Sequence, residues 1–318
     1  LMPGACKTGN LTLKPNSVVH SVLYDETEQK AIGVRVIDSI TKESQDYFAK
    51  VIFLNAATLN TNLILLNSKS NRFPNGLGND NGLLGKYIAF HNYRATISAE
   101  YEGFPDYTLE GAKPTTHYVP RFRNLYKQET DFLRGYAAGF EAFPLRETLR
   151  EGIGNDLKSQ LLQTKETGIW GVGSHMMGET LPKESNQVSL DSEKTDEWGI
   201  PLLRIDVDYD GNDEKMIQDF YEQFSEMYSK AGFTNIVTND NGRRPGNDIH
   251  EMGGVRMGKD PKTSLLNAWN QMHECKNVFV TDGACMTSTS TQNPSLTFMA
   301  ITARAANYAI QQLKKDLI

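Results

Sequence analysis

The chain has 318 residues, of which 39% are hydrophobic and 23% charged, and this balance excludes a disordered, collagen-like or coiled-coil protein. Its 33 Lys and Arg against 39 Asp and Glu give a net charge of -6, which argues against a nucleic-acid partner. The apolar runs are too short for a membrane span, and Cys6, Cys275 and Cys285 have neither disulfide nor metal-site spacing.

The first 70 residues have the pattern of strands joined by polar turns. Apolar and polar residues alternate over 18–24 and 31–37, so we expect two strands there with a turn between them. Further strands are predicted at 11–13 and 47–54, and the unbroken apolar run that ends the latter is typical of a strand buried inside a parallel sheet. A helix is predicted next, at 59–67, followed by an irregular loop rich in Gly and Asn.

Between residue 91 and about residue 209 the sequence is mixed, and short strand-like segments predict a second, sheet-based region. These segments are residues 94–100, 117–122, 188–190 and 202–207. A helix is predicted at 213–231, because its apolar residues recur at helical spacing, with Asp213 as the N-cap. A strand at 277–281 and a helix that starts at Pro294 complete the predicted elements.

The most specific pattern lies in three segments near the C-terminus. They read HEMGGVRMG from His250, NVFVTDG from Asn277 and QNPSLT from Gln292. Together they resemble the C-terminal signature of the glucose-methanol-choline (GMC) flavoprotein oxidoreductases, in which a histidine opens an HxxG…MG segment and a second His or Asn follows at a set distance. Here Asn293 stands 43 residues after His250. The Asn-Pro pair and the RMG triplet are most similar to the pyranose-oxidase and sugar-dehydrogenase branches.

The N-terminal region resembles the same family independently. Gly33-Val34 matches its GV-containing strand, and the run VIFLNAAT that ends at Thr58 is similar to its VILAAG strand end. The segment LLGKY with His91 resembles its GxxLxDH segment. Thr58 stands where the family usually has Gly, and Ala-Phe replaces the acidic step before His91. The resemblance covers residues 1–90 and 245–318 well and the middle of the chain weakly.

The resemblance implies FAD-dependent oxidation of a CH–OH group of a sugar, glycoside or polyol. His250 would take the hydroxyl proton while a hydride passes to flavin N5, and Asn293 would hold the substrate oxygen. Imidazole suits the first task, because its ordinary pKa of about 6.5 leaves it neutral at working pH. Two structural alternatives stay open. In the first, His250 is a loop residue that forms only local hydrogen bonds. In the second, Asn293 is the N-cap of a helix with Pro294 at N1.

By the same resemblance, FAD contacts fall at two strand ends and at the start of the last helix. The positions are Val18, Ala57, Asp282, Gly283, Pro294 and Ser295. Val18 would meet adenine through its backbone, the Asp-Gly pair would lie by the ribityl and pyrophosphate, and the helix start would face the flavin pyrimidine. The alternatives are a core strand residue at Val18 and a simple strand exit at Asp282.

The fold class expected is α/β, an α+β composite. A doubly wound FAD-binding domain would be assembled from residues 1–90 and 236–318, with an antiparallel-sheet substrate domain inserted at 91–235. No GxGxxG turn occurs in the sequence, so the FAD domain is expected to lack its N-terminal unit and the chain to be the C-terminal part of a longer enzyme. Whether this chain alone binds FAD is left open by that absence.

A rival function is a non-catalytic carbohydrate-binding or interaction module that has lost its flavin. A hydrolase is disfavoured, because the SxxK match at Ser39 has no SDN, KTG or GxSxG partner. His175, in the segment GSHMMG, is a candidate for lining a substrate pocket. The electron acceptor, the oligomeric state, covalent flavin attachment and a cytoplasmic or periplasmic location are all left open by the sequence, and no metal is expected.

Overall fold

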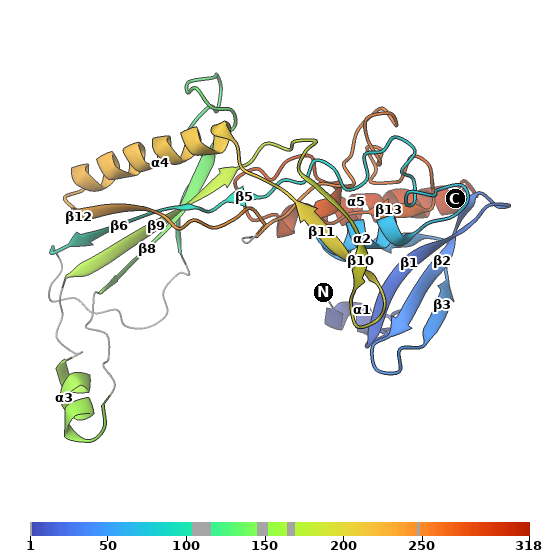
Figure 1. Ribbon diagram of the computed structural model, residues 1–318, viewed down its shortest axis with the longest axis horizontal. Helices are drawn as coiled ribbons and strands as arrows, with labels where there is room; N and C mark the ends of the chain where they lie inside the picture. The colour runs from blue at the N-terminus through green and yellow to red at the C-terminus, as the bar shows by residue number, and fades with distance from the viewer. Residues whose placement is uncertain (1, 104–115, 145–151, 164–168, 247–248) are drawn as a thin grey trace.

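A computed structural model of the chain describes residues 2–103, 116–144, 152–163, 169–246 and 249–318, and it shows a mixed α/β fold (Figure 1). The helices are α1 (Met2–Lys7), α2 (Thr58–Asn67), α3 (Asn155–Gln163), α4 (Gly211–Lys230) and α5 (Ser295–Leu313), with a 3₁₀ turn, η1 (Gly283–Cys285). The strands are β1 (Ser17–Asp25), β2 (Lys30–Asp38), β3 (Ser44–Phe48), β4 (Ile52–Leu54), β5 (His91–Asn92), β6 (Ala95–Tyr101), β7 (His117–Val119), β8 (Tyr136–Pro144), β9 (Trp170–Glu179), β10 (Gln187–Thr195), β11 (Pro201–Asp206), β12 (Thr234–Asp240) and β13 (Val278–Val280). None of these described helices is long and apolar enough to cross a membrane.

The elements form two lobes (Figure 1). One lobe is an antiparallel sheet in the order β12-β6-β9-β8-β7, with β5 paired to β9 and α4 lying along one face. The other lobe holds the β1-β2-β3 sheet, the β10-β11 pair, the parallel pair β4-β13, and helices α2 and α5. Each lobe has its own hydrophobic core, since one cluster draws only on residues 95–228 and the other on 22–84 and 255–285.

Helix α4 covers the large sheet because one of its faces is apolar. Met216, Ile217, Phe220, Phe224 and Tyr228 are buried at helical spacing against the sheet. The helix starts earlier than predicted: its side-chain N-cap is Asp210, which accepts from the backbone N–H of Asp213. Asp213 is therefore the third helical residue of a capping box, and its prediction as N-cap is wrong.

The N-terminal strands follow the predicted alternation with two differences. β1 and β2 pair antiparallel, and β2 continues into pairing with β3. Residues 11–13, predicted as a strand, do not form one: their side chains are exposed and they pair with no strand in the described part of the chain. The single strand predicted at 47–54 is two: β3 in the antiparallel sheet and β4 paired in parallel with β13.

The SxxK segment forms the turn between β2 and β3. Asp38 Oδ1 accepts from the backbone N–H groups of Ile40 and Thr41, and Lys42 Nζ donates to the backbone oxygen of Glu197. The lysine is thus committed to a structural bond at the surface.

The large sheet extends beyond the expected substrate domain. Thr234–Asp240, as β12, pairs with β6, so the sheet includes residues on both sides of position 235. The division into residues 1–90, 91–235 and 236–318 stays a prediction.

Candidate functional site

The segment that starts at His250 is held by backbone bonds to the turn after β13. Gly253 N–H donates to Gly283 O and Val255 N–H to Ala284 O, each at 3.0 Å. Asn62 of α2 adds a bond from its side-chain nitrogen to Gly253 O at 3.1 Å. The local sequence allows this path, because a Gly253 with φ +97° adopts a backbone conformation that other residues rarely take.

His250 lies at the start of this segment with its ring half-buried. Its backbone φ is 68°, in the left-handed region that non-glycine residues enter mostly at special sites. Its Nδ1 lies 3.1 Å from Nδ1 of His91, and the two rings meet edge to face with centroids 4.9 Å apart. Burial lowers the pKa of His250 from its ordinary value, so the ring is neutral near pH 7.

His91 is the residue that sequence reasoning missed. It lies in β5, is fully buried, and its Nε2 lies 3.1 Å from the backbone oxygen of Ser290. Burial, and secondarily the charge of a protonated His250, lower its pKa to about 4. The sequence placed His91 in a family-like segment, but no local pattern connects it to a histidine 159 residues away.

Asn293 lies at the end of the loop that His91 contacts, just before α5. Its side chain is exposed and has no hydrogen bond within the described residues. The helix starts at Ser295, its N-cap is Pro294, and no side chain caps it. The alternative in which Asn293 is the N-cap and Pro294 is N1 is therefore wrong, and the side chain is left available for another role.

Three of the residues predicted to contact FAD meet at the carboxyl edge of the parallel pair β4-β13. Ala57 follows β4, while Asp282 and Gly283 follow β13. Gly283 packs closely against the starts of α2 and α5: a Cβ on Gly283 would lie 2.2 Å from Thr58 Oγ1 and 3.6 Å from Phe298 in the first turn of α5. The start of α5 at Pro294 and Ser295 thus lies at the same edge, where open α/β sheets bind their ligands.

The Asp282 side chain is turned into the protein. Thr61 Oγ1 donates to one carboxylate oxygen at 2.6 Å, and Ala284 N–H donates to the other at 2.9 Å. Burial raises the pKa of this carboxyl group. Val18, by contrast, pairs with Ile37 in the three-stranded sheet, and the structure does not bring it to the β4-β13 edge.

Ala57 carries backbone strain. Its φ of 67° and ψ of 159° fall in a region that is essentially restricted to glycine. We expect Ala57→Gly to raise stability by about 1 kcal/mol, because relief of strain outweighs the entropy that glycine loses on folding. Thermal denaturation measures the effect. The matched control is Ala56→Gly next to it, which relieves no strain and is expected to lower the melting temperature; a fall in both variants contradicts the assignment of strain.

A cavity of about 500 Å³ lies on the face of the large sheet that α4 does not cover. Polar side chains from several strands line it: Thr96, Ser98, Glu141, His175 and Asn239. The alternation along β6 explains this face, because Ala95, Ile97 and Ala99 point into the core under α4 and leave Thr96 and Ser98 on the other side.

His175 joins the cavity to the histidine pair. Its ring lies over Gly139 of the neighbouring strand, where a Cβ would come within 2.5 Å of the ring. The ring stacks on Tyr93 with centroids 5.5 Å apart, and the ring centroids of Tyr93 and His91 lie 5.9 Å apart. A row of aromatic rings therefore runs from the cavity to His250.

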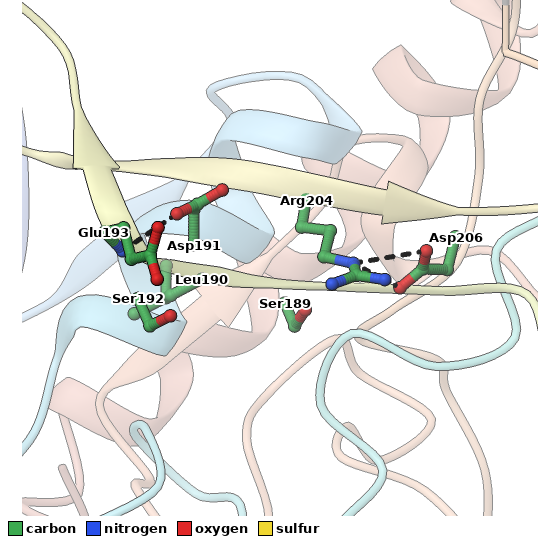
Figure 2. Close-up of a pocket in the computed structure, with 7 residues that line it drawn as sticks. All are labelled: Ser189, Leu190, Asp191, Ser192, Glu193, Arg204 and Asp206. Carbon is green, nitrogen blue, oxygen red and sulfur yellow. Dashed lines mark hydrogen bonds and ion pairs between the residues drawn. The ribbon is translucent and has the colours of Figure 1, made fainter.

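A second hollow, of about 380 Å³, lies on the β10-β11 hairpin (Figure 2). Three of its charged side chains already have partners: Arg204 Nε donates to Asp206 at 3.0 Å, and Asp191 accepts from the backbone N–H of Glu193 at 2.9 Å. Arg204 and Asp206 are also well exposed to water. This hollow offers no unpaired buried group for recognition and lies on a different element from the histidines.

Comparisons with known proteins match the part of the chain that holds His250 and Asn293. A family model described as GMC oxidoreductase matches residues 182–302, which include the segment after His250 and the loop with Asn293. The chain contains a GMC oxidoreductase C-terminal segment. A formate oxidase from Aspergillus oryzae has a similar fold, with a TM-score of 0.64 at 12% identity over 98% of this chain and 62% of that one.

Relatives of this protein include enzymes named for diols and sugars. It is 31% identical to the 2-methyl-1,2-propanediol dehydrogenase of Mycolicibacterium austroafricanum, over 88% of this chain and 51% of that protein. It is 25% identical to the fructose dehydrogenase large subunit of Gluconobacter japonicus, over 95% and 54%, and 26% identical to the paromamine 6'-oxidase of Streptomyces fradiae, over 93% and 52%. The chain thus spans about half the length of each of these relatives.

Proposed function

We propose that this GMC chain carries the catalytic pair of an FAD-dependent enzyme that oxidises a CH–OH group of a sugar, glycoside or polyol. His250 is the base and Asn293 its partner. The observation that carries the proposal is His91, which bonds His250 through one ring nitrogen and the loop leading to Asn293 through the other. His250 and the loop that leads to Asn293 are thereby bonded to one buried ring.

The β4-β13 edge fits FAD. The first backbone hydrogen bond of α5 runs from Phe298 N–H to Pro294 O, so the backbone N–H groups of Ser295 and the next two residues have no acceptor within the helix. These N–H groups would favour the negative charge of a reduced flavin ring. Ala57, Gly283, Pro294 and Ser295 would hold the group, and Val18 would reach its adenine end from β1. Bound FAD supplies the acceptor for the hydride.

The substrate class follows from the cavity and from the relatives. The cavity presents hydroxyl, carboxylate, amide and imidazole groups, which together donate to and accept from a molecule with several hydroxyl groups. The names of the relatives describe oxidation of a diol, of fructose and of paromamine. A polyhydroxylated substrate would extend from this cavity along His175 toward His250.

In this mechanism the chain moves one proton. The neutral ring of His250 would take the hydroxyl proton at Nε2, since Nδ1 is engaged with His91. The side-chain amide of Asn293 would donate to the same oxygen as it gains negative charge, which stabilises the transition state more than the ground state. The donor carbon can then release its hydride.

The test is His250→Ala in the natural protein with FAD bound. We expect the turnover number to fall by at least about 100-fold while flavin absorbance is retained, which is the usual scale for the loss of a general base. His273→Gln is the control, because the His273 side chain bonds Ser264 on another segment, and its turnover should match the wild type. Unchanged turnover in His250→Ala, or sugar binding by a protein that holds no flavin, contradicts the proposal and favours a binding module.

A further inference from the structure

We propose that His91 is a positioning residue that holds His250 in the tautomer protonated at Nδ1, with Nε2 left as the proton-accepting nitrogen. The functional meaning of that nitrogen rests on the proposed function, but the tautomer itself does not. The argument needs only the hydrogen bonds of one buried ring.

Nε2 of His91 is the nitrogen that faces away from His250. It lies 3.1 Å from the backbone oxygen of Ser290, and a carbonyl oxygen can only accept. Nε2 of His91 therefore carries a hydrogen. Burial lowers the pKa of His91 to about 4, so at neutral pH the ring has a single N–H and its Nδ1 is a lone pair.

The second step transfers this constraint to His250. The two Nδ1 atoms lie 3.1 Å apart, and one of them must donate. Because His91 Nδ1 has no hydrogen, His250 Nδ1 donates, and neutral His250 then has its lone pair at Nε2. No hydrogen bond engages that nitrogen within the described residues, so it is left open to a substrate hydroxyl.

The backbone carbonyl of Ser290, which accepts from His91, lies in a loop that is itself held in place. Its loop is held on both sides, since Tyr118 Oη donates to Thr291 O at 2.9 Å and Ser288 bonds the buried carboxylate of Glu179. The loop ends at Asn293. The same loop thus carries one member of the proposed pair and, through His91, sets the protonation of the other. This is how a base is ordinarily oriented by a third group.

The experiment is nuclear magnetic resonance of the chain labelled with ¹⁵N-histidine, about two pH units above the ordinary histidine pKa of about 6.5. Couplings from the ring nitrogens to the carbon-bound protons show which nitrogen is protonated. Comparison with His250→Ala assigns the signals. Wild-type His250 is expected to be protonated at Nδ1, with His91 protonated at Nε2. A wild-type His250 protonated at Nε2 overturns the proposal without any variant.

Two variants separate positioning from general support of the fold. His91→Asn offers a side-chain oxygen near the position of Nδ1, so His250 is expected to keep its Nδ1 proton. His91→Leu removes the acceptor, so His250 is expected to change to the Nε2–H form. His273→Gln is the matched control and should leave the signals of His250 unchanged. If His250 keeps its Nδ1 proton in His91→Leu, His91 does not set the tautomer.

The readout does not depend on turnover. Should the tautomers behave as expected while His250→Ala keeps full activity in the natural protein, positioning by His91 stands and the proposed base is wrong.

Discussion

Gly253→Ala is expected to lower the stability of the chain by at least about 4 kcal/mol, a drop in melting temperature of roughly 10 °C. The added Cβ would lie 2.2 Å from the backbone oxygen of Tyr87, and a backbone atom cannot turn aside as a side chain can. Alanine would also pay for a φ of +97°. The segment is bonded on both sides, to Gly283 and to Asn62, so it has little room to shift.

Gly232→Ala is the matched control. Gly232 also has a positive φ, of +84°, but a Cβ there would meet no atom within 4 Å. It should cost only the roughly 1–2 kcal/mol of the backbone conformation. The difference between the two variants in thermal denaturation measures the steric part, and equal losses would show that the contact with Tyr87 is unimportant.

The second large effect concerns pH and the buried carboxyl group of Asp213. Burial raises its pKa from 3.8 to about 7. A raised pKa stabilises the fold below pH 3.8, and that contribution is lost as the pH rises through 7. The loss amounts to about 4 kcal/mol between pH 3.8 and 7, of which about 3 kcal/mol falls above pH 5, from 1.36 kcal/mol per pKa unit. We expect Asp213→Asn, which has no charge to bury, to lose much less stability between pH 5 and pH 8.

The comparison requires pH scans of both proteins by chemical denaturation. His91 acts in the opposite sense, because its pKa is lowered to about 4 and the stability it contributes is lost as the pH falls from 6.5. That contribution is the same in both proteins and cancels in their difference. Glu222→Gln removes an exposed carboxylate from the same helix and should follow the wild-type curve. Parallel curves for wild type and Asp213→Asn would contradict the buried-charge account.

Local patterns predicted the elements that depend on local contacts. Helix α4 follows from its apolar stripe alone, although the choice between Asp210 and Asp213 as N-cap depends on one turn of helix that the stripe cannot fix. Strands β1 and β2 follow from their alternation. The strands β8 and β9 were missed because both are rich in small residues with weak strand preference, such as Gly139, which the ring of His175 requires.

The site was only partly predictable, because local patterns do not show contacts between distant segments. The segment after His250 and the loop with Asn293 were found from motifs, and the family they indicate is confirmed. The roles of these residues, and of Val18, Ala57, Asp282, Gly283, Pro294 and Ser295 toward FAD, stay predictions. The motif that includes His91 was visible in the sequence, but its contacts were not, because one joins it to another histidine and one to a backbone atom, and both are made only on folding.

The two faces of the large sheet differ, since one packs against α4 and the other carries the polar cavity. Along β6, Ala95, Ile97 and Ala99 pack beneath α4, while Thr96 and Ser98 line the cavity. Under the proposed function, a mutation at Thr96 or Ser98 would change recognition and leave the packing of Ile97 intact. Substrate preference would then be altered in the laboratory by single substitutions that cost little stability. The residues of β6 that would set recognition are therefore not the residues that hold the core together.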